Sequence, residues 1–209
     1  MTPAPVPGPD EAPALAPEEA LRAEIYGLLA HVFAAAPSAA VLEAVAGASA
    51  DLGAPGEPLH EAWRALRRAA GAADAAALEV EHAELFVGTG RAKVSIYASH
   101  YLSETWKEHT LVGLRDELDG LGLARQAGVT QPEDHLSALL EVMRHLAQRG
   151  TGEAALAHQQ RFFERYIGPW LEQFGAALAQ VGGTPFYGAA AEMLLAFGDL
   201  ERQAFRLAE

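Results

Sequence analysis

The chain has 209 residues, half of them apolar, and its 28 acidic and 15 basic side chains give a net charge of −13. This composition is typical of a globular protein that repels nucleic acid and anionic membranes and favours basic partners. The chain contains no cysteine, which excludes disulfides, thiolate nucleophiles, Cys-ligated zinc and iron–sulfur clusters.

The N-terminal residues 1–17 are rich in proline and show no apolar periodicity. They predict a flexible tail, followed by one domain over residues 18–209. This tail lacks the basic and apolar regions of a signal peptide, and no apolar run in the chain reaches the roughly 18–20 residues of a membrane span. We therefore expect a cytoplasmic protein with no stable membrane insertion.

After the tail, apolar residues recur at helical spacing and no stretch shows the alternation of a β-strand. The pattern predicts an all-α fold, a single bundle of about nine or ten helices. The expected helices cover 17–36, 38–48, 58–70, 74–86, 97–107, 110–121, 132–149, 153–166, 169–181 and 186–207. Ser38, Asp74 and Thr110 are the expected N-caps of three of them, because their side-chain oxygens can accept a free N–H of the first turn.

The segment 130–136 predicts a helix start after a glycine-containing break. Thr130 and Glu133 have the Ser/Thr-x-x-Glu spacing of a capping box, and Pro132 is tolerated in a first helical turn. Leucines at helical spacing follow and must face a core. We expect the helix to cover 132–149.

Asp134 and His135 fall in the first turn of that expected helix, beside a possible subdomain hinge near 124–132. Acids are favourable near the positive end of a helix dipole, and a histidine at the edge of an apolar face is commonly a packed, hydrogen-bonded residue. Local physics alone therefore leaves both as ordinary residues of a helix start, on the rim of the core.

The glycine-containing loop 88–93 invites a phosphate-binding interpretation. It lacks the Gly-Lys-Ser/Thr ending of a P-loop, and no predicted strand precedes it. A connector between helices is the simpler interpretation, and weak nucleotide binding is left open. No nucleophile elbow is present either.

Two Glu-x-x-His pairs match the spacing that di-iron carboxylate bundles use. They are Glu57/His60 and Glu79/His82. A complete site would need further carboxylates, for which Glu104 and Glu141 are candidates. An all-α metal-binding bundle is therefore an alternative to the function given below, and separate surface residues are the simpler interpretation.

Three separated segments share a pattern with one family. They are Glu-Leu-Phe-Val-Gly-Thr-Gly at 84–90 with Tyr-Ala-Ser-His-Tyr-Leu at 97–102, Gln-Pro-Glu-Asp-His-Leu at 131–136, and Phe-Phe, Pro-Trp and Pro-Phe-Tyr within 162–187. They resemble the Leu-Phe-x-Gly-x-Gly and Tyr-x-Ser-x-Tyr motifs, the Glu-x-Pro-x-Asp-His signature and the C-terminal helices of the TorD/DmsD family of redox-enzyme maturation chaperones. The resemblance covers about residues 18–205. Gln131 replaces an acid and Ala98 a glutamate.

The resemblance implies a cytoplasmic chaperone, not an enzyme, with no cofactor of its own. It would bind the twin-arginine signal peptide and apo-form of a molybdopterin oxidoreductase, aid cofactor insertion and delay export until folding is complete. Formate dehydrogenase and the DMSO/TMAO-type reductases are admissible clients, and a nitrate-reductase-type assembly chaperone is a second alternative. Such proteins occur as monomers or as domain-swapped dimers.

The resemblance also suggests signal-peptide-binding residues. Asp134 would be the charge partner of the arginines and His135 a hydrogen-bonding residue at the rim. The other expected members are Tyr97, Ser99, Tyr101, Glu84, Phe86 and Trp106, with Gly88, Gly90 and Pro132 as loop or hinge positions. An Arg–carboxylate fork beside an apolar groove suits a leader with two arginines and an apolar core.

Overall fold

The computed structural model describes residues 15–49, 51–88, 92–102, 104–124, 131–150 and 152–207, of which 104–110 by backbone alone. The expected tail therefore lies almost wholly outside the described residues. So do Gly90, Thr130, most of the predicted hinge and the side chain of Trp106.

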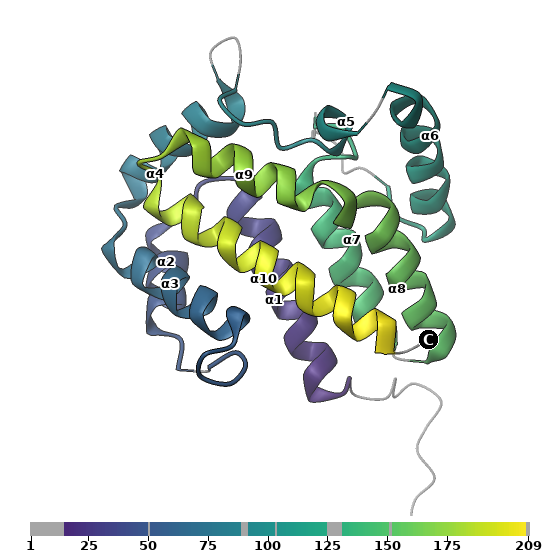
Figure 1. Ribbon diagram of the computed structural model, residues 1–209, viewed down its shortest axis with the longest axis horizontal. Helices are drawn as coiled ribbons and strands as arrows, with labels where there is room; N and C mark the ends of the chain where they lie inside the picture. Colours follow the sequence, from purple (N-terminus) through teal and green to yellow (C-terminus); the bar gives the residue numbers. More distant parts are fainter. Residues whose placement is uncertain are drawn as a thin grey trace, which may run out of the picture.

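The described residues form α-helices joined by short connections, with no β-strand among them (Figure 1). The first five are α1 (Pro17–Ala34), α2 (Ala39–Gly47), α3 (Pro58–Ala72), α4 (Ala75–His82) and α5 (Ala98–Tyr101). The others are α6 (Glu104–Gly120), α7 (Leu136–Gln148), α8 (Glu153–Tyr166), α9 (Leu171–Val181) and α10 (Pro185–Leu207). A π-helix, η1 (Ala83–Val87), continues α4, and a 3-10 turn, η2 (Gly168–Trp170), precedes α9. The all-α prediction is confirmed.

Local sequence signals set several of the helix starts. The Ser38 hydroxyl accepts the Val41 N–H at 3.4 Å, and the Asp74 carboxylate accepts the Ala77 N–H at 2.8 Å. Each side chain satisfies one of the N–H groups that a first turn leaves without an intrahelical partner. Both predicted N-caps are confirmed.

The predicted boundary between a helix over 97–107 and a helix over 110–121 is wrong. The chain is extended at Leu102, which ends α5, and α6 begins at Glu104 and continues without a break through Thr110. The backbone of Thr110 is therefore inside a helix and not at a helix start. The predicted helix over 74–86 likewise changes to the wider η1 after His82.

The core lies where α1 packs along α7, while α10 packs against α3 and α9 (Figure 1). Phe33 of α1 is fully buried at its centre. Its ring contacts Phe86 of η1, Phe174 of α9 and Tyr187 of α10, with centroids 5.5 to 6.4 Å apart. Edge-to-face aromatic packing of this kind adds to the free energy gained by burial, so η1 is anchored to the helical core.

A buried ion pair joins the first and last helices. The Arg22 guanidinium donates two hydrogen bonds to the Glu201 carboxylate, from Nε at 2.8 Å and from Nη2 at 2.6 Å. Glu201 is 1% exposed and also accepts the Tyr26 hydroxyl at 2.8 Å. Arg22 further donates to the Gln159 side chain of α8 at 3.0 Å. The pair thus ties α1, α8 and α10 together.

Within the described part of the chain, no helix combines the length and apolar character needed to cross a lipid bilayer.

Replacing Glu201 with alanine should lower the free energy of unfolding by about 3–5 kcal/mol, because it strands a largely buried guanidinium and the Tyr26 hydroxyl. Urea denaturation measures the change. The matched control is Glu61→Ala, whose ion pair with Arg64 is 3.9 Å long and half exposed. That variant should change stability by less than about 0.5 kcal/mol. Equal effects of the two substitutions would contradict the anchoring role of Glu201.

Candidate functional site

The Tyr97 and His135 segments, far apart in the sequence, run antiparallel side by side and form an isolated β-bridge. Two backbone hydrogen bonds of 3.0 Å close the bridge. They join the Ala98 N–H to the Asp134 carbonyl and the Leu136 N–H to the Ile96 carbonyl. The two motifs behind the family resemblance therefore meet at one place, the start of α7.

Asp134 is buried in this bridge, with 4% of its surface exposed. One carboxylate oxygen accepts the Ser99 N–H in the first turn of α5 at 2.9 Å. That N–H would otherwise lack a partner, as in every first helical turn. Asp134 therefore holds α5 against the beginning of α7, and its predicted position on an open rim is wrong.

The start of α7 also differs from the prediction. The helix begins at Leu136, and the N-cap is His135, whose Nδ1 accepts the Ser137 N–H at 3.2 Å. Residues 132–135 lie outside the helix because the backbone at His135 is extended and pairs with the Tyr97 segment. A long-range pairing has replaced the local helix start that the capping-box spacing predicted.

His135 is 5% exposed and packs edge-to-face against the Tyr97 ring, with 5.1 Å between centroids. Burial lowers the pKa of His135 to about 4, although the Asp134 carboxylate acts in the opposite direction. The imidazole is therefore neutral at physiological pH. A neutral ring suits its role as N-cap acceptor, since a protonated Nδ1 could accept nothing.

The structure places Phe86, Tyr101 and Glu84 in three different surroundings. Phe86 is buried close to Tyr97 and His135, and all three line one cavity. Tyr101 stacks on Trp170 at 5.3 Å and donates its hydroxyl to the Ser95 carbonyl at 2.8 Å, so it belongs to the packing of α5. Glu84 is exposed and pairs with Lys93 at 2.6 Å, away from the bridge.

The loop and hinge positions are placed as follows. Gly88 ends η1 with φ at 65°, a left-handed conformation that favours glycine, and its N–H donates to the Ala83 carbonyl at 2.7 Å. Pro132 is exposed, and its carbonyl accepts the His135 N–H at 3.2 Å. Pro132 thus adjoins the His135 segment, Gly88 ends η1, and Gly90 is outside the described residues.

Two cavities adjoin His135. The first, the η1 cavity, has a volume of about 580 Å³. Its lining includes His82, Phe86, Lys93, Ser95, Tyr97 and His100. The second, the α7 cavity, has a volume of about 820 Å³. Its lining includes Leu118, Leu123, Glu133, Ala138, Glu141 and Val142. Both cavities are also lined by Ala34, Gln131 and His135, so His135 stands between them.

The α7 cavity combines apolar side chains with carboxylates. Glu133 is paired with Arg115 of α6 at 3.2 Å, and Glu141 with Arg144 one turn along α7 at 3.4 Å. The Arg115, Glu141 and Arg144 side chains are each about half exposed, so these pairs hold their partners weakly. An incoming arginine could compete for either carboxylate.

The sequence prediction missed several of these lining residues. His82 belongs to a Glu-x-x-His pair, Glu133 to the capping-box spacing and Gln131 to the family signature, and none of these patterns predicts a place on a cavity lining. Glu141 was considered only as a metal ligand. Glu141 falls between Leu140 and Met143 but off the apolar stripe of α7, on the exposed face, and that spacing could have indicated a rim residue.

The metal-site hypothesis finds no cluster to support it within the described residues. No group of three or more histidine, aspartate or glutamate side chains there has the geometry to hold a metal ion. Glu57 instead turns to the loop before α3, where its carboxylate accepts the Ala54 N–H at 2.9 Å. His60 is buried in α3, and His82 packs on Phe86 at 5.2 Å.

Comparison with known proteins identifies the family. The model of the nitrate reductase delta subunit family matches residues 53–176, more than half of the chain. This chain belongs to that family. The matched residues include the Tyr97 and His135 segments, and the resemblance to TorD-type chaperones is confirmed by individual relatives.

Those relatives include chaperone protein TorD from Shewanella amazonensis, which is 34% identical over 98 residues, 46% of this chain and 39% of that protein. TorD from Actinobacillus pleuropneumoniae is 30% identical over 121 residues, 57% of this chain and 59% of that protein. TorD from Vibrio cholerae is 28% identical over 128 residues, 57% of this chain and 58% of that protein. This member of the delta subunit family thus aligns with about two fifths to three fifths of each relative.

The lowered pKa of His135 makes stability depend on pH. Between about pH 4 and 6.5 the unfolded chain binds a proton at this residue and the folded chain does not, so the free energy of unfolding should fall as pH drops through this window. Urea denaturation between pH 7 and 4 measures the effect. His135→Asn keeps a capping oxygen and cannot titrate. Its curve should be flatter than that of the wild type.

The comparison with His135→Asn is needed because burial also lowers the pKa values of His82 and His145. These residues contribute to the same pH window in both proteins, so only the difference between the two curves reports on His135. Parallel curves for wild type and variant would contradict a buried, neutral His135. A direct NMR titration of the His135 ring should give a midpoint near pH 4.

Proposed function

We propose that this protein is a cytoplasmic, non-enzymatic chaperone that binds the twin-arginine leader of a molybdopterin oxidoreductase precursor and holds the apo-enzyme during cofactor insertion. The observation that carries the proposal is the bridge between the Tyr97 and His135 segments, flanked by two cavities. The names of the TorD relatives support a chaperone role for this chain. Delayed export of an unfinished client would follow from a masked leader.

The α7 cavity has the chemistry that such a leader requires. Leu118, Leu123 and Val142 offer apolar surface to the hydrophobic part of the leader. Glu133 and Glu141 lie on the same cavity and offer carboxylates to the arginines, whose planar forks bind carboxylates in a bidentate way. The net charge of −13 would attract a basic segment before contact, most strongly at low salt.

The η1 cavity would take a neighbouring part of the leader. His135 lines both cavities and stands between them, while Tyr97 and Phe86 line the η1 cavity only. Ser99 and Tyr101 would act by fixing α5 in place, through their bonds to Asp134 and to the Ser95 carbonyl. Glu84 and Trp106 would make peripheral contacts with the leader.

Asp134 would act in two ways, one in the closed bridge and one after the bridge opens. In the closed bridge it is occupied by the Ser99 N–H and contributes negative charge next to His135. A direct fork with a leader arginine requires that bond to open, with Gly88, Gly90 and Pro132 as the loop positions that would absorb the movement. The same opening would allow exchange of helices between two copies, which is the route to a domain-swapped dimer.

The test is calorimetric binding of synthetic twin-arginine leader peptides from molybdoenzyme precursors of the native host. At least one leader should bind with micromolar or tighter affinity, and Asp134→Ala combined with His135→Ala should abolish that binding. Glu133→Gln with Glu141→Gln should weaken it about tenfold, corresponding to about 1.4 kcal/mol. Replacing both leader arginines with lysine should also weaken it, because the bidentate forks are lost.

The matched control is Glu24→Gln with Glu43→Gln, which removes the same charge from exposed positions of α1 and α2. It should leave binding within about twofold of wild type at physiological salt. The proposed leader site would be wrong if the double variant at Asp134 and His135 stayed folded by circular dichroism and bound every leader as tightly as wild type.

A second candidate is a chaperone that assembles a cytoplasmic nitrate-reductase-type catalytic subunit. The observation that favours it is the family description itself, the nitrate reductase delta subunit. The site would be the same, and the ligand would be a subunit N-terminus without a twin-arginine pair. Purification from the native host followed by mass spectrometry separates the two, because each predicts a different client in the complex.

A further inference from the structure

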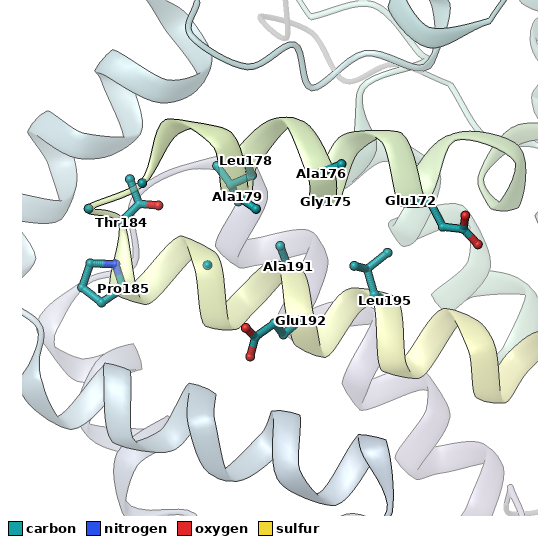
Figure 2. Close-up of a pocket in the computed structure, with 13 residues that line it drawn as sticks. Glu172, Gly175, Ala176, Leu178, Ala179, Thr184, Pro185, Ala191, Glu192 and Leu195 are labelled. Carbon is teal, nitrogen blue, oxygen red and sulfur yellow. The ribbon is translucent and has the colours of Figure 1, made fainter.

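A groove runs between α9 and α10, on a part of the surface that shares no lining residue with either cavity at His135 (Figure 2). Its volume is about 680 Å³. Its lining is mostly small and apolar and includes Gly175, Ala176, Ala179, Gly188 and Ala191, with Leu178, Pro185 and Leu195 as larger apolar members. The two helices form an antiparallel hairpin closed by Gly182, Gly183 and Thr184.

Two of the glycines between these helices are needed for packing, and one is not. A Cβ added at Gly175 would lie 2.7 Å from Leu195 Cδ1, and one added at Gly198 would lie 2.9 Å from Leu171 Cδ1. A Cβ at Gly188 would meet nothing within 4 Å. Glycine inside a helix costs about 1 kcal/mol relative to alanine. At Gly188 no close contact in the structure requires it, and the residue lines the groove.

The charged side chains of the groove are all acidic. Glu172 of α9 and Glu192 of α10 are exposed on its lining, and no basic residue is among the lining residues (Figure 2). Neither carboxylate has an ion-pair partner among the described residues, in contrast to Glu133 and Glu141. The groove therefore combines apolar contact surface with negative charge that the described residues leave without a counter-ion.

A neighbouring cavity lies beyond the hairpin loop. It shares Gly182, Gly183 and Thr184 with the groove and is also lined by Glu81 and by the Glu84–Lys93 ion pair. The Oε1 atom of Glu81 is buried and has no hydrogen-bond partner within the described part of the chain.

We propose that the α9–α10 groove is a docking site for a basic amphipathic helix of a partner protein. A third helix fits between two antiparallel helices when its side-chain ridge enters the groove between them. A small apolar stripe would lie over Gly188 and Ala179, and lysines or arginines would meet Glu172 and Glu192. A second copy of this chain is disfavoured as occupant, because it would bring acidic faces of two chains with net charge −13 together.

The test uses NMR titration of the isotope-labelled full chain. The probe is an alanine-based helical peptide of about 14 residues, slightly longer than α9, with leucines on one face and arginines near both ends. Amide signals of α9 and α10 should shift in a saturable way. A peptide with glutamates in place of the arginines should produce no shifts, because the groove would repel it.

Two variants locate the site. Glu172→Gln with Glu192→Gln should weaken peptide binding about tenfold, as expected for the loss of two exposed ion pairs. Gly188→Leu should abolish it by filling the groove, while raising thermal stability through better helix propensity. The matched control, Glu24→Gln with Glu43→Gln, should bind as wild type. The double variant at Asp134 and His135 should also retain binding, which makes this proposal independent of the leader site.

Several outcomes would overturn the proposal. They are absence of binding by the arginine peptide, equal binding by the glutamate peptide, unchanged binding by Gly188→Leu, and shifts confined to residues around His135. A further such outcome could come from analytical ultracentrifugation of the chain without peptide, which measures its oligomeric state. A dimer that Gly188→Leu converts to a monomer would assign the groove to a second copy of the chain.

Discussion

The crossing of the Tyr97 segment and the Asp134–His135 segment is the contact on which the candidate site depends. Two backbone hydrogen bonds and the bond from the Ser99 N–H to the Asp134 carboxylate hold it closed. Each contributes only about 1 kcal/mol net, but breaking one inside the protein leaves a buried polar group without a partner. The position of α5, the start of α7 and the place of His135 between the two cavities all follow from this crossing.

The crossing is supported from both sides by the core. On one side α7 packs along α1, which the Arg22–Glu201 pair fixes to α10. On the other side Phe86 inserts between Phe33, Phe174 and Tyr187 and thereby anchors η1. The cavities are thus bounded by elements that pack directly on the core. A π-helix at such a place is consistent with a local adjustment for function.

Most helices could be predicted because their signals are local. Apolar spacing gave the buried faces of α1 and α7, and Ser38 and Asp74 marked helix starts through hydrogen bonds to N–H groups three residues ahead. The start of α7 could not be predicted in this way. The capping-box spacing of Thr130 and Glu133 was a valid local pattern, but the bridge to Tyr97, nearly forty residues earlier, determined the backbone conformation at His135.

At the site, too, local sequence signals could not predict features that depend on long-range contacts. Motif resemblance named Asp134 and His135, yet their burial, the N-cap role of the imidazole and the Ser99 bond depend on partners that no periodicity reveals. Glu141 shows the converse, because its role beside the α7 cavity rests on placement and not on any motif.

The two proposed binding surfaces use the same chemistry, but they are formed by different kinds of structure. Both place carboxylates beside apolar side chains, as a basic amphipathic ligand requires. The leader site lies around a long-range bridge, and its innermost carboxylate, Asp134, is reached only if that bridge opens. The α9–α10 groove lies in a helix hairpin whose walls touch directly at Gly175 and Gly198. The first surface can therefore couple binding to a change of shape, whereas the second is preformed and should bind without one.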